Sequence, residues 1–160
     1  MDPKALLSIL KEGTEKIFGS MVRMKVQAVP TEEAIELPQR HITAMVGFAG
    51  THVGLASIHS SMDFGVKIAS SMTGIAPQDL TGEDMRDALG EIANMIGGDF
   101  KSRFADTLVE KDSVFDQSVP SVISGEDYST FTVTDAPRYC LKVTTEEGDT
   151  FYVELALKEA

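Results

Sequence analysis

The sequence of 160 residues contains one cysteine, Cys140, and comparatively few basic residues. One thiol cannot form an intramolecular disulfide bond or supply a cysteine-based zinc site. The chain has 14 Lys and Arg residues against 25 Asp and Glu residues, which gives a formal net charge of −11. An acidic field repels the phosphates of nucleic acid, so we expect no nucleic-acid partner. The simplest interpretation of the charge is a solvated surface.

Long hydrophobic runs are also missing. No apolar stretch reaches membrane-spanning length, and the N-terminus has its charges after a short apolar run, without a small-residue cleavage site. These features predict a cytoplasmic protein with no signal peptide and no membrane partner. Hydrophobic residues make up 42% of the chain, enough for one core. We therefore expect residues 1–160 to form a single domain.

Apolar residues recur at helical spacing in three segments. The first begins at Asp2 and Pro3, a cap followed by a first-turn proline, and is expected to end near Gly19. The second covers residues 64–72 and is closed by a glycine and a proline. The third, over residues 81–105, has the clearest start signal, a threonine followed by acidic residues.

Between the helices, alternating or short apolar segments predict about six strands. They cover residues 22–29, 41–48, 52–59, 130–134, 139–145 and 151–157. A turn at residues 147–149 joins the last two strands into a hairpin. Helices combined with hairpin-linked strands predict an α+β fold, with helices packed on a largely antiparallel sheet of about six strands.

The third helix has two contrasting faces, since residues are spaced at about 100° around a helix. One face is an apolar stripe, expected to pack on the sheet, that consists of Met85, Leu89, Ile92, Ile96 and Phe100. The opposite face is a polar stripe that consists of Asp87, Glu91, Asn94 and Gly98. Periodicity alone explains the polar stripe as the solvated face of an amphipathic helix.

Two consecutive glycines, Gly97 and Gly98, stand inside this helix. Each costs about 1 kcal/mol relative to alanine, so each should have a reason to be there. Gly98 lies on the polar stripe, where a missing side chain lets another backbone come close to Asn94. Alternatively, the pair kinks the helix or ends it early. The spacing favours neither interpretation.

The spacing Asp87-x3-Glu91-x2-Asn94, in the segment DALGEIANMIGGDF, resembles the signature of the CheC/CheX/FliY family of chemotaxis phosphatases. The family pattern is an Asp or Ser, then Glu, then Asn, with a proline about one strand further on. The resemblance covers most of the chain, and the length and the single complete motif are most similar to CheX. Pro120, in PSVISG, matches the downstream proline but lies three residues later than the commonest spacing.

The first helix carries an incomplete copy of the pattern, Ser8-x3-Glu12-x2-Glu15, with Pro38 at the family's usual distance. The match predicts two pseudo-equivalent halves, as in CheC/CheX-like folds, although short matches of helical period also arise by chance. Glu15 stands where the motif has Asn, and its negative charge would repel a phosphate. We therefore expect the first helix to be inactive.

The resemblance implies hydrolysis of the aspartyl phosphate on a response-regulator receiver domain, such as phosphorylated CheY. Asn94 is then the residue that orients the attacking water, because a carboxamide is an acceptor and a donor without charge. Glu91 pairs with a cationic group of the receiver, which in the family is a lysine. Asp87, Gly98 and Met95 complete the expected docking surface. Asp87 is equally explained as a solvated first-turn acid, and Met95 as a core residue.

The resemblance also implies no cofactor of the protein's own, with Mg²⁺ belonging to the receiver. CheX-like members form homodimers, and the regular strand over residues 151–157 is expected to present an open edge for a second copy. The alternative function is a non-catalytic receiver-binding or flagellar-switch-like scaffold. The histidines, His41, His52 and His59, are interpreted as surface or core residues rather than a metal site.

Overall fold

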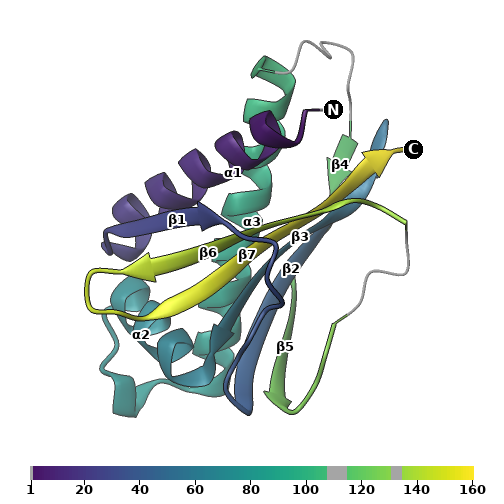
Figure 1. Ribbon diagram of the computed structural model, residues 1–160. Helices are drawn as coiled ribbons and strands as arrows, with labels where there is room; N and C mark the ends of the chain where they lie inside the picture. Colours follow the sequence, from purple (N-terminus) through teal and green to yellow (C-terminus); the bar gives the residue numbers. More distant parts are fainter. Residues whose placement is uncertain (1, 108–114, 131–134) are drawn as a thin grey trace.

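The computed structural model describes residues 2–107, 115–130 and 135–160. Its helices are α1 (Pro3–Ile17), α2 (Met62–Thr73) and α3 (Gly82–Thr107), with a π-helical turn η1 (Phe18–Val22) and a 3₁₀ turn η2 (Pro77–Asp79). Its strands are β1 (Val26–Pro30), β2 (Arg40–Gly50), β3 (His52–Ser61), β4 (Phe115–Gln117), β5 (Ser121–Glu126), β6 (Arg138–Thr145) and β7 (Thr150–Glu159). The helices gather on one side of the sheet (Figure 1).

The described strands form one antiparallel sheet in the order β1-β6-β7-β3-β2-β4, and β5 pairs with β2 beside β4. The predicted α+β class, the antiparallel sheet and the β6–β7 hairpin are therefore confirmed. β4 and β5 were not predicted. Both are short, and β5 is a mostly exposed segment with the sequence SVISGE, so neither has a clear hydrophobic pattern. The predicted strand over 130–134 lies outside the described residues, apart from Thr130.

The strand order has the pseudo-symmetry expected of two related halves. One half consists of α1, β1 and the β2–β3 hairpin, and the other of α3, β5 and the β6–β7 hairpin. The strand of each half that is not part of its hairpin pairs with the hairpin of the other half: β1 pairs with β6, and β5 pairs with β2. The two hairpins meet at the centre through β3 and β7. The two motif-bearing helices are thus equivalent in topology, although only α3 carries the complete motif.

The first helical segment does not end at Gly19 as predicted. The chain continues as a π-helical turn to Val22 and leaves the helix at Arg23, which has a left-handed φ of 59°. Phe18 and Val22 are fully buried, and Phe18 stacks on Phe151 with 4.6 Å between ring centroids. Burial of these two side chains stabilises the extra turn, so β1 begins at Val26 instead of residue 22.

The predicted open edge at β7 is wrong, because β7 lies between β3 and β6 at the centre of the sheet. Both faces of this strand are buried, including Tyr152 at 7% exposure and Glu154 at 8%. Among the strands that the structure describes, the open edges belong instead to β1 on one side and to β4 and β5 on the other.

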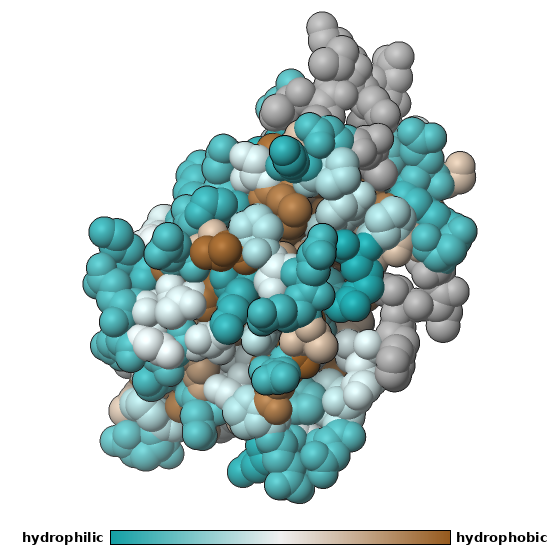
Figure 2. Space-filling view, viewed as in Figure 1, coloured by the Kyte–Doolittle hydropathy of each residue, from teal (hydrophilic) through white to brown (hydrophobic). Residues whose placement is uncertain are grey.

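The surface seen in Figure 2 is mostly hydrophilic, with hydrophobic side chains in small, separate groups. Such a surface agrees with the excess of acidic residues in the chain. Across the described ranges, none of the helices combines the length and the apolar character needed to cross a membrane.

Candidate functional site

The start of α3 is fixed by a reciprocal capping box. The Thr81 hydroxyl accepts a hydrogen bond from the Asp84 N–H at 3.1 Å, and the Asp84 carboxylate accepts one from the Thr81 N–H at 3.0 Å. These bonds satisfy two backbone donors that a helix terminus otherwise leaves free. The predicted start of the third helix is confirmed, and the rotational position of every later residue follows from it.

The apolar stripe of α3 packs on the sheet as predicted. Its side chains are all buried, namely Met85, Leu89, Ile92, Ile96 and Phe100. The polar stripe lies on the other side of α3 from the apolar stripe, with Asp87 and Glu91 exposed and Asn94 half-buried. Neither Asp87 nor Glu91 makes a hydrogen bond or ion pair to another described residue. Both carboxylates are therefore available to a partner.

Asn94 differs from its two acidic neighbours because β4 lies beside it. The side-chain amide of Gln117 donates hydrogen bonds to the main-chain carbonyl and to the side-chain Oδ1 of Asn94, each at 2.9 Å. Gln117 was missed in the sequence because no motif includes it and the short β4 was not recognised. Only the fold brings residue 117 to residue 94.

Pro120 lies beside the motif helix despite its shifted position in the sequence. A Cβ added at Gly90 would be 3.5 Å from the Pro120 ring and 3.5 Å from a methyl of Val122, so the segment entering β5 packs directly on α3. A groove of about 460 Å³ runs along this contact, lined by Arg86, Asp87, Gly90, Glu91, Pro120 and Val122. Pro38, in contrast, lines a cavity formed by residues of the loop before β2 and of other strands.

The two glycines of α3 have different surroundings. The helix continues past them to Thr107, so they do not end it. A Cβ at Gly97 would lie 2.5 Å from a Val46 methyl and 3.2 Å from the Gln117 amide, which only glycine avoids. Of the described residues, a Cβ at Gly98 would meet only Gln117, with Oε1 at 3.8 Å. Gly97 is required by internal packing, whereas Gly98 leaves open space beside Asn94.

Met95 is half-buried and packs against the hydrophobic core from its edge. Most of the Met95 side chain is therefore buried against the core, as the core interpretation expects.

The chain is similar to known chemotaxis proteins. The family model described as "Chemotaxis phosphatase CheX" matches residues 42–144, which include all of α3 and none of α1. The chain belongs to the CheX family. No curated protein sequence matches it.

Solved structures agree with this family assignment. A chemotaxis protein CheX from Desulfovibrio desulfuricans is 25% identical, with a TM-score of 0.74 over 96% of this chain and 99% of that chain. A CheC-like superfamily protein from Shewanella sp. PV-4 is 22% identical, with a TM-score of 0.80 over 99% of both chains. The CheX-CheY-BeF3-Mg²⁺ complex from Borrelia burgdorferi contains a chain that is 20% identical, with a TM-score of 0.75 over 96% of this chain and 97% of that one.

In this CheX-family chain the two glutamates of the incomplete motif in α1 are engaged in contacts within the protein. Glu12 forms an ion pair with Arg103 of α3 at 2.9 Å. The Glu15 carboxylate accepts hydrogen bonds from the Lys11 ammonium at 2.6 Å and from the Ala28 N–H of β1 at 3.0 Å. Burial by itself raises the pKa of the Glu15 carboxyl, but the hydrogen bonds from Ala28 and Lys11 outweigh it, so the pKa is lowered. Glu15 is thus an ionised residue with a structural role, because its carboxylate links α1 to β1 through the hydrogen bond from Ala28.

Replacing Glu15 by Asn is expected to create no second active site. The shorter amide gives up the bond to the Ala28 N–H and the ion pair with Lys11, which should cost about 1 kcal/mol of unfolding free energy at this partly exposed site. Urea unfolding of Glu15→Asn should show the loss, and receiver dephosphorylation should stay at the wild-type rate. A clear doubling of turnover would show that α1 had lacked only the amide.

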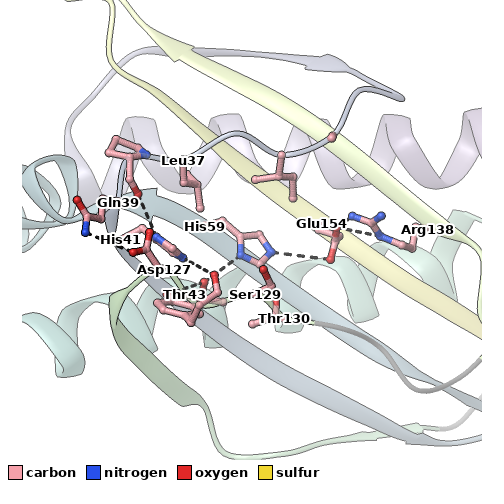
Figure 3. A pocket seen from close by; sticks show the side chains of 14 residues that line it. Leu37, Gln39, His41, Thr43, His59, Asp127, Ser129, Thr130, Arg138 and Glu154 are labelled. Carbon is pink, nitrogen blue, oxygen red and sulfur yellow. Dashed lines mark hydrogen bonds and ion pairs between the residues drawn. The ribbon is translucent and has the colours of Figure 1, made fainter.

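A second polar region lies away from the motif helix. A cavity of about 510 Å³ is lined by the loop before β2, by residues 127–130, and by side chains from β2, β3, β6 and β7. Figure 3 shows His59 between Thr43 and Glu154, with Arg138 beyond Glu154. His59 Nδ1 lies 3.0 Å from the Thr43 hydroxyl, whereas His59 Nε2 is 3.8 Å from Glu154, too far for a hydrogen bond.

The other two histidines, His41 and His52, pack against aromatic rings. The ring of His41 packs against that of Tyr128, with centroids 3.9 Å apart, in the same cavity. The ring of His52 makes an edge contact with Phe104, with centroids 4.9 Å apart. The three histidines are therefore buried packing residues, as the core interpretation expects.

Glu154 is expected to make the stability of the fold depend on pH. Burial by itself raises the pKa of this carboxyl, but interactions with His59 and Arg138 outweigh it, so the folded-state pKa lies below the ordinary value. A lowered folded pKa means that the carboxylate stabilises the fold above the unfolded pKa of about 4.3, and that this contribution is lost as the pH falls through the folded pKa. Urea unfolding between neutral and acid pH measures it, and Glu154→Gln should flatten the acid limb. An unchanged acid limb in that variant would contradict the assignment.

Proposed function

We propose that this CheX-family protein hydrolyses the aspartyl phosphate of a CheY-like receiver domain, with Asn94 and Glu91 as the working pair. The observation that carries the proposal is the polar stripe of α3, which presents two carboxylates without a partner among the described residues and one hydrogen-bonded carboxamide beside an open groove. A protein of similar fold is recorded in the CheX-CheY-BeF3-Mg²⁺ complex from Borrelia burgdorferi, which supports a receiver as partner.

The reaction requires the phosphatase to position a water molecule, and it requires no covalent intermediate on the phosphatase. Hydrolysis of an acyl phosphate needs a water held in line with the leaving carboxylate oxygen, and phosphoryl transfer depends mostly on geometry and charge stabilisation. Asn94 suits this role because its neutral amide hydrogen-bonds a water without repelling the phosphoryl group. The receiver supplies the phosphorylated aspartate and holds the Mg²⁺.

Glu91 and Asp87 form the docking edge of this surface. Glu91 is one helical turn before Asn94, is exposed, and has no partner among the described residues. A receiver lysine that pairs with Glu91 would set the depth to which Asn94 enters the receiver's active site. Gly98 leaves room for the receiver backbone on the other side of Asn94.

The test is a dephosphorylation assay with purified protein. Receivers phosphorylated from a small-molecule donor in the presence of Mg²⁺ are incubated with and without the protein, and loss of the phosphoryl group is followed. Accelerated decay with at least one receiver supports a phosphatase. Unchanged decay combined with binding of the same receivers would instead support a scaffold.

We also propose that the protein is a homodimer, paired through the β5 edge in place of the β7 edge that the sequence had suggested. Among the described strands β5 lies at an edge; it contains Ile123, which is 42% exposed, and it follows Val119, which is 83% exposed. Exposed strand edges are commonly covered or paired. The motif stripe on α3 would stay free in each copy.

Light scattering tests the dimer directly, with an expected mass of twice 17.3 kDa at micromolar concentration. Ile123→Lys should shift the protein to the monomer. Val29→Lys, which places the same charge beside the opposite sheet edge at a residue 52% exposed, is the matched control and should remain dimeric. A wild-type mass near 17 kDa would rule out the dimer and leave the phosphatase proposal intact.

A further inference from the structure

The contact between Gln117 and Asn94 assigns a role to a residue outside the motif. We propose that Gln117 is a positioning residue, which holds the Asn94 carboxamide in one orientation for the attacking water; this inference rests on the function proposed above. Gln117 comes from β4, is half-buried, and bonds both the main-chain and the side-chain oxygen of Asn94 at 2.9 Å.

The two bonds together fix which end of each amide faces the other. The main-chain carbonyl of Asn94 only accepts hydrogen bonds, so Gln117 must turn its NH₂ group toward it. The same NH₂ group then meets the Asn94 side chain, which must present its oxygen as the second acceptor. Asn94 therefore has Oδ1 turned toward β4 and Nδ2, with two donor hydrogens, turned away from Gln117.

The surroundings of Gln117 hold it in this place. Its backbone pairs with Phe48 of β2, and the adjacent Ser118 exchanges hydrogen bonds with Gly47, whose N–H donates to the Ser118 hydroxyl at 2.8 Å. A side chain at position 97 would lie 3.2 Å from both the Cδ and the Nε2 of Gln117. Gly97 thus leaves the space in which the glutamine amide reaches Asn94.

The consequence for the reaction is preorganisation. A free asparagine side chain on a helix surface samples several rotamers and both amide orientations, and only part of that population would hold water in line. With Oδ1 engaged, Asn94 approaches the receiver with its two N–H donors and the second lone pair of Oδ1 already in position. Fixing a positioning group before the partner binds lowers the barrier without adding contact area.

Two substitutions separate this role from simple packing. Gln117→Met keeps the length of the side chain but donates no hydrogen bond. Gln117→Glu keeps the shape but replaces the donor by an acceptor, so it repels both oxygens of Asn94 and favours the reversed amide. Asp116→Ser, at an exposed neighbour on β4 that makes no hydrogen bond to Asn94, is the control, and it adds no second asparagine to the chain. Thermal unfolding first establishes that each variant is folded.

The expected kinetic result is a loss in the chemical step alone. The single-turnover rate at saturating phosphorylated receiver should fall about tenfold for Gln117→Met and further for Gln117→Glu, while KM changes by less than about twofold because the docking edge is intact. Asp116→Ser should behave as wild type. A wild-type rate in folded Gln117→Met, or a change confined to KM, would overturn the proposal.

A second readout does not depend on activity. Asn94 is the only asparagine in the chain, so ¹⁵N-asparagine labelling gives a single side-chain NH₂ signal in the NMR spectrum. We expect Gln117→Met and Gln117→Glu to shift and broaden this signal, and Asp116→Ser to leave it unchanged. An unchanged signal in both Gln117 variants would overturn the assignment even if activity fell. If the wild-type protein has no phosphatase activity, the function proposed above fails, and the NMR result still decides whether Gln117 orders Asn94.

Discussion

Asn94→Ala is expected to lower receiver dephosphorylation at least tenfold and to leave the fold intact. A tenfold loss corresponds to about 1.4 kcal/mol of barrier, a modest value for a group that positions the nucleophile. The side chain belongs to the polar stripe and not to the core, so its removal opens no buried cavity. The Gln117 amide loses one acceptor but keeps the main-chain carbonyl of Asn94. Single-turnover decay of the phosphorylated receiver, together with a thermal melt, measures both expectations.

Retention of more than about a tenth of the activity would remove Asn94 from the water-positioning role. Asn94→Asp adds a useful comparison, because it keeps the shape of the side chain and adds a negative charge facing a negative phosphoryl group. We expect this variant to be inactive too, for the same reason that we expect Glu15, at the matching place in α1, to be inactive. Activity in Asn94→Asp would mean that the residue acts as a base and not as a neutral amide.

Glu91→Gln is expected to weaken receiver binding at least tenfold and to leave the rate at saturation nearly unchanged. The exposed carboxylate has no partner among the described residues, so its whole contribution is available to a cationic group of the receiver. An ion pair desolvated in an interface loses more than about 2 kcal/mol when one partner is truncated. Titration of single-turnover rates against receiver concentration separates KM from the rate at saturation.

Glu83→Gln is the matched control for Glu91, because it removes the same charge from the same helix. Glu83 lies in the first turn of α3, two turns before Glu91, and is exposed. Binding by Glu91→Gln should also lose part of its dependence on salt, while Glu83→Gln should keep it. If Glu91→Gln instead lowers the rate at saturation and leaves KM unchanged, the roles of Glu91 and Asn94 have been exchanged.

The sequence was sufficient for the motif helix. The start at Thr81, the buried stripe from Met85 to Phe100, and the exposed stripe opposite it all depend on capping and helical periodicity, which are local properties of the chain. The hairpins were predictable for the same reason, since their turns and alternating strands are continuous in sequence. The family resemblance used these local features, and the comparisons confirm it.

Tertiary structure decided the features that depend on contacts between distant residues. β7 has the regular alternation of an edge strand, but its position between β3 and β6 depends on pairings with residues far along the chain. The roles of the two matching helix residues also depend on distant partners. Glu15 is held by the N–H of Ala28 in β1, and Asn94 is oriented by Gln117, 23 positions away. Local pattern therefore determined which residues of α3 face outward. Long-range packing alone determined which strand edge is open, and how the side chain of Asn94 is held.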